Sequence, residues 1–264
     1  MPDVQYRSFR FSHLGLALAV VAMLAGCSGP VDLSDTYPRN DDYPRPKDYP
    51  IHGIDVSKFQ GDIDWKAVAD AGVKFAWIKA TEGGDRADEH FQANWTGAKA
   101  AGVPRGAYHF VYWCRAPLEE MTWFEQNAPV EDDALPPVLD VEATPTSPTC
   151  RRHLEKQRTV AEIKLMLEEM GRHYGKRPII YTTVDFYEAI LSDGALSDYP
   201  IWVRSTKYHP AVKYGSRAWQ FWQYQSDGKT PGIDGRVDRD VFYGSKEQWQ
   251  AFLTAQNPPT LAGP

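Results

Sequence analysis

The feature that most constrains the fold is a unit that recurs along the chain: a helical segment, a glycine and then a short apolar run. Glycine follows the expected helix end in Ala71-Gly72-Val73, Ala101-Gly102-Val103 and Tyr174-Gly175-Lys176. Glycine at that place adopts the left-handed conformation that closes a helix, and the apolar run after it is typical of a buried strand. The repetition predicts an α/β fold with a parallel sheet and crossover helices.

The expected elements alternate over most of the chain. We expect strands at residues 75–80, 107–111, 138–141, 179–181, 201–203 and 221–224, and helices at residues 65–71, 87–101, 118–127, 152–174 and 184–191. A closed β/α barrel and an open doubly wound sheet both fit this alternation. No GxGxxG loop follows the first strand, which weakens a nucleotide-binding interpretation.

The first residues have the pattern of an export signal. Arg7 and Arg10 precede an apolar run from Leu14 to Ala25 that is too short to cross a bilayer comfortably. The run ends in Leu24-Ala25-Gly26-Cys27, which resembles the lipobox of bacterial lipoproteins, where the cysteine receives lipid. An ordinary signal peptide with an incidental cysteine is the alternative. We expect residues 1–27 to be a lipoprotein signal peptide and Cys27 to anchor the chain in the cell envelope.

Proline is frequent in the next segment, at positions 30, 38, 44, 46 and 50. Such a density of proline prevents helix formation and hinders sheet pairing, so residues 28–50 are expected to form a semi-extended tether. One catalytic domain should follow at residues 51–254, and residues 255–264 should form a C-terminal tail. Ser28, directly after the cysteine, favours the periplasmic face of the outer membrane in a cell with two membranes.

Two further cysteines, Cys114 and Cys150, lie in loop-like stretches after expected strands. An exported chain with two spare cysteines usually pairs them. We therefore predict a disulfide between adjacent loops. A catalytic thiol is the competing interpretation, but neither cysteine lies in a nucleophile motif.

Composition limits the partners. The formal net charge of −6 argues against a nucleic-acid partner, which usually meets a basic face. Nine Trp, fourteen Tyr and eleven Phe mainly fill a core, but flat rings also suit a carbohydrate cleft. The histidines show no HExxH or similar metal spacing, and we expect no cofactor, no metal and a monomer.

Acidic residues recur at the expected strand ends: Asp55, Glu82, Asp140, Glu142 and Asp238. In a β/α barrel the carboxyl ends of the strands gather around one mouth, where active sites are found. Acids that are distant in sequence would therefore meet in space.

Asp140 and Glu142 form the sharpest pair. Two apart on a strand, they point to the same face, with Cβ atoms roughly 7 Å apart. Neighbouring carboxylates oppose each other's ionisation, so one pKa should rise and keep a proton available. Glycosidases need such a proton donor together with a carboxylate. An isolated pair could equally be two surface acids at a loop edge.

The surrounding segments resemble glycoside hydrolase family 25, the N-acetylmuramidase lysozymes. The resemblance is carried by GIDVSKFQG at 53–61 with IDW at 63–65, FAWIKATEG at 75–83, GAYHF at 106–110, PVLDVE at 137–142, and WQY at 222–224 with GRVD at 235–238. It spans about Ile51 to Tyr243, in the family's order. It implies a single-domain, irregular (β/α) barrel similar to a TIM barrel.

The resemblance also implies roles for individual residues. Glu142 matches the general acid that protonates the glycosidic oxygen and later activates water, and Asp140 would tune it. Asp55 and Asp238 match the other acids of the cleft. Whether the nucleophile is a carboxylate or the substrate's N-acetyl group stays open.

Four more positions are expected to contact substrate: Glu82, Tyr108, Trp222 and Tyr224. Packing at the barrel rim is about as good an explanation for Trp222. The implied partner is the glycan strand of peptidoglycan.

The chain departs from the family at Arg204, which could pair with a cleft acid or contact a substrate carboxylate, and at the segments 114–117 and 144–150, which would reshape the cleft. The first hypothesis is a muramidase that cleaves between N-acetylmuramic acid and N-acetylglucosamine. A peptidoglycan-binding lipoprotein with weak or lost turnover is the second, and a lipoprotein that only bridges envelope components is the third.

Overall fold

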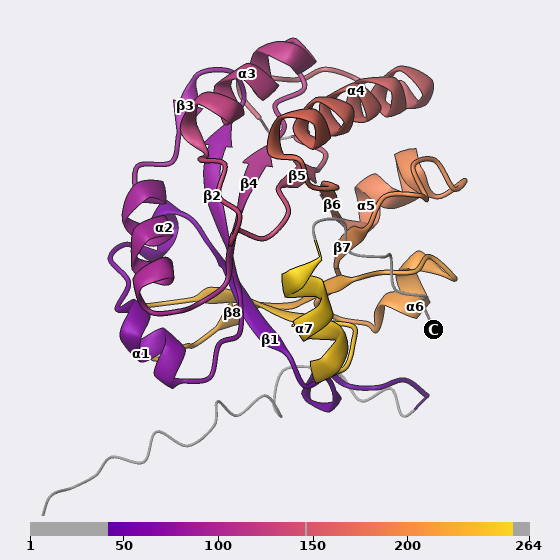
Figure 1. The fold of residues 1–264 in the computed structure, drawn as a ribbon. Helices are drawn as coiled ribbons and strands as arrows, with labels where there is room; N and C mark the ends of the chain where they lie inside the picture. Colours follow the sequence, from indigo (N-terminus) through magenta and orange to yellow (C-terminus); the bar gives the residue numbers. More distant parts are fainter. Residues whose placement is uncertain (1–41, 146, 256–264) are drawn as a thin grey trace, which may run out of the picture.

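The computed structural model describes residues 42–145 and 147–255. The expected signal peptide, Cys27, the first part of the expected tether and residues 256–264 lie outside the described residues. The strands close into a barrel ringed by helices (Figure 1). Within the described part of the chain, no helix is long and apolar enough to cross a bilayer.

The barrel has eight strands: β1 (His52–Val56), β2 (Ala76–Glu82), β4 (Arg105–Phe110), β5 (Val138–Val141), β6 (Ile179–Thr182), β7 (Ile201–Arg204), β8 (Phe221–Gly228) and β9 (Val237–Phe242). The strands from β1 to β8 pair in parallel, and β9 closes the ring as an antiparallel strand between β8 and β1. A short strand, β3 (Arg86–Ala87), pairs with β2 outside the ring. The expected barrel is confirmed, and the open sheet that the sequence also allowed is excluded.

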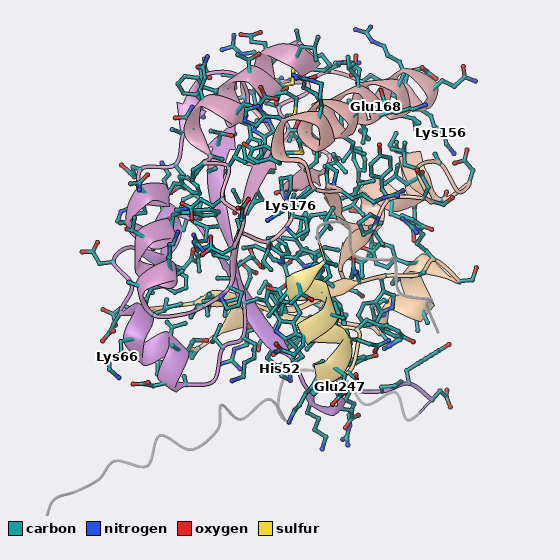
Figure 2. All side chains as sticks on the ribbon, in the orientation of Figure 1. His52, Lys66, Lys156, Glu168, Lys176 and Glu247 are labelled. Carbon is teal, nitrogen blue, oxygen red and sulfur yellow. A yellow bond between two sulfur atoms is a disulfide. The ribbon has the colours of Figure 1, made fainter. Side chains whose placement is uncertain are left out.

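The helices surround the ring: α1 (Trp65–Asp70), α2 (Phe91–Ala100), α3 (Pro117–Asn127), α4 (Lys156–Tyr174), α5 (Val184–Phe186) with a π-helical turn (Tyr187–Leu191), α6 (Pro210–Tyr214) and α7 (Lys246–Thr254). Short 3-10 helices lie at Pro46–Asp48 and Lys58–Gln60. The glycines expected at helix ends have positive φ values of 91° at Gly72, 72° at Gly102 and 64° at Gly175. Exposed side chains such as Lys66 and Glu168 lie on the outer helices (Figure 2).

Two helices begin later than predicted. α2 begins at Phe91 instead of residue 87, because Arg86 and Ala87 pair with β2 as a strand. α4 begins at Lys156 instead of residue 152, because the Glu155 side chain caps it by accepting hydrogen bonds from the next backbone N–H groups. The expected elements did not include β1, β3, β9, α6 or α7.

The barrel interior is filled with aromatic rings below its mouth. Trp77 and Trp202 lie 5.7 Å apart between ring centroids, and Phe221 packs against Trp77 at 5.3 Å. A Cβ at Gly106 would lie only 2.0 Å from the Trp77 ring, so glycine is required there. α7 packs Trp249 against the Phe221 ring at the end where the parallel strands begin. A site would therefore have to lie at the opposite end of the barrel, where the parallel strands end.

Residues 43–50, which we expected in the tether, pack on the outside of the barrel. Tyr49 is buried, with its ring 5.6 Å from Trp219 and 6.1 Å from Trp222. Its hydroxyl lies 3.2 Å from Nε2 of His209, and Tyr43 stacks on the same imidazole at 4.8 Å. The ordered packing thus begins before Ile51.

Candidate active site

A cleft of about 270 Å³ opens at the carboxyl ends of the parallel strands. It is lined by Asp55, Ser57, Phe59, Lys79, Tyr108, Phe110, Asp140, Glu142, Tyr181, Trp202, Arg204, Gln223 and Asp238. Five of the residues expected from the sequence therefore meet here: Asp55, Tyr108, Asp140, Glu142 and Asp238. Closure of the barrel brings them together from β1, β4, β5 and β9.

Asp140 and Glu142 are coupled at the end of β5. Burial raises the pKa of Asp140 well above its usual range, and the Glu142 charge and a side-chain hydrogen bond between the two groups raise it further. Burial also raises the pKa of Glu142, but Arg204, the hydrogen bond from Asp140 and Lys79 oppose that rise. Both carboxyl groups therefore hold a proton more readily than isolated carboxyl groups do, with Asp140 deeper and Glu142 nearer to solvent.

The second acidic group comes from β1 and β9. Asp55 and Asp238 are direct partners in the antiparallel pairing of these strands, so their carboxylates lie close together. Burial raises the pKa of Asp55, and the charges of Asp238 and Asp240 add to the rise, while an amide hydrogen bond from Gln223 at 2.7 Å opposes it. Burial raises the pKa of Asp238 to about 6. Asp238 is thus largely ionised at neutral pH, whereas Asp55 retains its proton more readily.

Two cations balance the acids. Arg204 on β7 lowers the pKa of both Glu142 and Asp238. Lys79 on β2 lies over the Phe110 ring, and its ammonium donates a 2.8 Å hydrogen bond to Glu82. Glu82 itself lines a neighbouring pocket instead of the cleft. Its place beside the substrate is therefore indirect, through Lys79.

Trp222 and Tyr224, which we expected to contact substrate, do not line the cleft. Their side chains are 0% and 3% exposed and belong to the core outside the barrel ring. Alternation along β8 explains the difference, because Gln223 between them points into the ring. The structure corrects the expectation for both residues.

The family follows from comparison with known proteins. The model of glycosyl hydrolases family 25 matches residues 54–233, which contain the cleft acids Asp55, Asp140 and Glu142. The chain belongs to glycosyl hydrolase family 25. As a member of this family it is a glycoside hydrolase.

Several known proteins are similar to this chain over most of their length. The chain is 37% identical to the uncharacterized protein YegX of Escherichia coli K12, over 77% of this chain and 73% of YegX. It is 34% identical to lysozyme M1 of Streptomyces globisporus, over 74% of this chain and 68% of that protein. The structure of a family 25 glycosyl hydrolase from Bacillus anthracis superimposes with a TM-score of 0.71 at 35% identity, covering 83% and 97% of the two chains.

Several residues in and beneath the cleft of this family 25 domain were missed from the sequence. Tyr181, Trp202 and Gln223 line the cleft from strands whose expected contribution was apolar. Asp240 lies beneath them, fully buried, and accepts a 2.8 Å hydrogen bond from the Trp202 indole. Alternate residues of a strand face the same side. Applying this alternation to the strands next to Asp140 and Asp55 could have identified these residues from the sequence.

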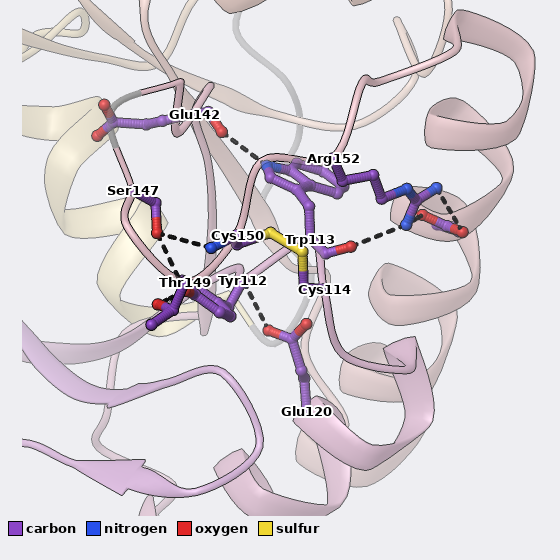
Figure 3. The surroundings of a disulfide bond; sticks show 10 residues. Tyr112, Trp113, Cys114, Glu120, Glu142, Ser147, Thr149, Cys150 and Arg152 are labelled. Carbon is purple, nitrogen blue, oxygen red and sulfur yellow. Dashed lines mark hydrogen bonds and ion pairs between the residues drawn. A yellow bond between two sulfur atoms is a disulfide. The ribbon is translucent and has the colours of Figure 1, made fainter.

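The predicted disulfide is present and joins the loop that follows β5. Cys114 and Cys150 are bonded, with Cα atoms 5.6 Å apart, and link the loop after β4 to the loop after β5 (Figure 3). The indole of Trp113 donates a 2.7 Å hydrogen bond to the backbone carbonyl of Glu142, and Arg152 donates to the carbonyl of Trp113 at 2.9 Å. Arg152, the first residue of the helix expected at residues 152–174, lies before α4 and holds this loop.

Within the described residues, no cluster of three or more His, Cys, Asp or Glu side chains could hold a metal ion. The acids of the cleft are instead paired with one another and with Arg204 and Lys79, an arrangement that suits proton transfer.

Proposed function

We propose that this protein is a lysozyme that cleaves the β-1,4 bond between N-acetylmuramic acid and N-acetylglucosamine in peptidoglycan. The proposal rests on one observation above all, the Asp140–Glu142 pair in the mouth of the barrel, where burial raises the pKa of both carboxyl groups. The lysozyme name of a relative that is 34% identical supports the substrate class.

Glu142 is the proton donor in this proposal. Its side chain is the more exposed member of the pair, so a glycosidic oxygen in the cleft can reach it. After the proton leaves, Arg204 and Lys79 stabilise the carboxylate, which can then take a proton from water. Asp140 helps to keep the pair protonated before each turnover, because burial and the Glu142 charge raise its pKa.

Asp55 and Asp238 supply negative charge on the other side of the cleft. Asp238, with a pKa of about 6, is largely ionised at neutral pH and can stabilise the positive charge that develops on the sugar ring. Because one chain supplies all the residues that line the cleft, we propose that the monomer is the active form.

The deciding experiment is digestion of purified peptidoglycan followed by mass spectrometry of the products. The protein should release fragments with N-acetylmuramic acid at the reducing end, and Glu142→Gln should reduce the rate by at least about 100-fold because it removes the proton donor. Glu168→Gln, an exposed change on α4, serves as the matched control and should retain full activity.

Products with N-acetylglucosamine at the reducing end would contradict the muramidase proposal and would show that the protein is a glucosaminidase. Binding of glycan strands without product release would instead support the peptidoglycan-binding alternative. Equal rates for Glu142→Gln and the unsubstituted protein would remove Glu142 from the mechanism.

We also propose that the protein is anchored to the cell envelope through lipid on Cys27, on the periplasmic face of the outer membrane where a cell has two membranes. The support is the Leu24-Ala25-Gly26-Cys27 motif after an apolar run, which lies outside the described residues. Cys27→Ser should move the protein from the detergent phase to the aqueous phase in a phase-separation assay. An unchanged distribution would refute the anchor.

A further inference from the structure

A second pocket, of about 320 Å³, lies next to the catalytic cleft. It is formed by the turn after β2 and by the two loops that the disulfide joins, and its charged residues are Glu82, Asp85, Arg86 and Arg115. None of these residues takes part in the proton transfers proposed above.

The pocket and the cleft share a wall. Glu82 lines the pocket, and its carboxylate accepts the hydrogen bond from Lys79, which lines the cleft. In the β2–β4 pairing Glu82 lies opposite Phe110, another residue of the cleft. A substrate bound in the cleft can therefore extend a substituent into this pocket.

The pocket is held in shape by buried contacts. The backbone N–H of Tyr112 donates a 2.8 Å hydrogen bond to Glu120, which is 1% exposed and also bonded to His109 at 2.9 Å. The Tyr112 hydroxyl contacts Ser147 at 3.0 Å and also bonds Thr149, across the disulfide-linked loops (Figure 3). The walls are thus fixed without a ligand.

The charges of the pocket are of both signs and exchangeable. Arg115 bonds Asp85, and a nitrogen of Arg86 lies 3.5 Å from Glu82. The Arg115 side chain is 38% exposed and that of Arg86 67%. Ion pairs with such exposure contribute little to stability, so a ligand with its own carboxylate and ammonium groups can replace them.

We propose that this pocket binds the peptide that peptidoglycan carries on its muramic acid, an inference that rests on the proposed function. The N-acetyl sugars of the glycan offer hydroxyl and amide groups, which do not require guanidinium partners. The peptide carries free carboxylates and, where it contains a diamino acid, an ammonium group. Arg115 pairs with a peptide carboxylate, and Asp85 accepts from its amino group.

The test compares two substrates: soluble glycan strands that carry peptides, and the same strands after an amidase has removed the peptides and left a free lactyl carboxylate on each muramic acid. With the full-length protein, Arg115→Gln should lower kcat/KM for the peptide-bearing strands about tenfold by raising KM. The kcat/KM for the stripped strands should stay unchanged. Arg115→Lys, which keeps the charge, should restore most of the loss. Arg172→Gln on α4 is the surface control.

Equal losses on both substrates, or no loss on either, would overturn the inference while the proposed function stands. An unsubstituted protein that cleaves neither substrate would overturn the proposed function itself. Because Arg115→Gln also removes the contact with Asp85, thermal unfolding is measured alongside. If Arg115→Gln lowers the thermal midpoint, the unsubstituted protein is titrated with the free peptide instead. Absence of binding at millimolar peptide would then overturn the inference.

Discussion

At the scale of single residues, the cleft depends on carboxyl groups that are close in sequence or register but differ in solvation. Asp140 is deeper than Glu142 on the same strand, and burial raises its pKa more strongly. Arg204 counteracts the effect of burial on both Glu142 and Asp238. A residue that departs from the family pattern thus lowers the pKa of two acids of the cleft.

Arg204→Gln should therefore move the pH profile of kcat/KM to higher pH. Loss of the guanidinium charge raises the pKa of Glu142. In the proposed mechanism Glu142 must be protonated to act as an acid, so the basic limb moves to higher pH. The loss also raises the pKa of Asp238 above its value of about 6, and because the proposed mechanism uses Asp238 as an anion, the acidic limb moves to higher pH as well. The profile is measured with soluble glycan oligomers from about pH 4 to about 9.

Arg204→Lys is the matched control, because it keeps the positive charge and should leave both limbs close to their original positions. A profile that stays in place in Arg204→Gln, or that moves to lower pH, would contradict the assigned electrostatic role.

At the scale of elements, the loops after β4 and β5 act as one unit. The disulfide joins them, and Trp113 connects that unit to the backbone of Glu142 through a 2.7 Å hydrogen bond. The position of Glu142, the proposed proton donor, is thus set partly by a loop that carries no acid.

Replacing both cysteines by alanine should lower the free energy of unfolding by about 2–4 kcal/mol, because the bond closes a loop between residues 36 apart in the chain. It should also lower kcat more than it raises KM, since the carbonyl of Glu142 loses a fixed partner. Denaturant unfolding and steady-state kinetics check the two effects.

Trp113→Phe separates positioning from stability, because it removes the indole donor and keeps an aromatic ring. A fall in kcat at nearly unchanged thermal midpoint would support positioning. Full activity in this variant would show that the hydrogen bond has no part in catalysis.

At the scale of the whole molecule, the N-terminal segment packs against the outside of the barrel, beside the start of β8 and the loop before α6. Tyr49 covers Trp219 and Trp222 on the outside of the barrel, and Tyr43 and Tyr49 enclose His209. Residues 43–50 are thus part of the folded unit.

A chain that begins at Ile51 should therefore be less stable than one that begins at Asp42. Removing the Tyr49 ring alone should cost about 3 kcal/mol, because it opens a cavity beside two buried tryptophans. Thermal unfolding of the two chains and of Tyr49→Ala measures the difference. Lys47→Ala, a change at an exposed position of the same segment, provides the control. Identical thermal midpoints for the two chains would show that residues 43–50 belong to the tether and not to the folded unit.

Much of the fold was predictable because local chemistry encodes it. The glycines at helix ends, the apolar strands and the acids that follow them are short-range patterns, and they indicate the α/β class and the Asp140–Glu142 pair. β9 was not predictable in the same way. Its sequence, Val237-Asp238-Arg239-Asp240-Val241-Phe242, has charged residues on both faces, so it lacks the apolar alternation of an ordinary strand.

Sequence alone therefore determined the chemistry at each strand end and the cysteines available for pairing. Only the tertiary structure decided which side chains share the cleft, because the side of the barrel on which a residue lies depends on closure of the ring and on register. That is why Gln223 faces the acids while its neighbours Trp222 and Tyr224 are buried outside the ring. It is also why Asp55 and Asp238, distant in the chain, face each other across two antiparallel strands.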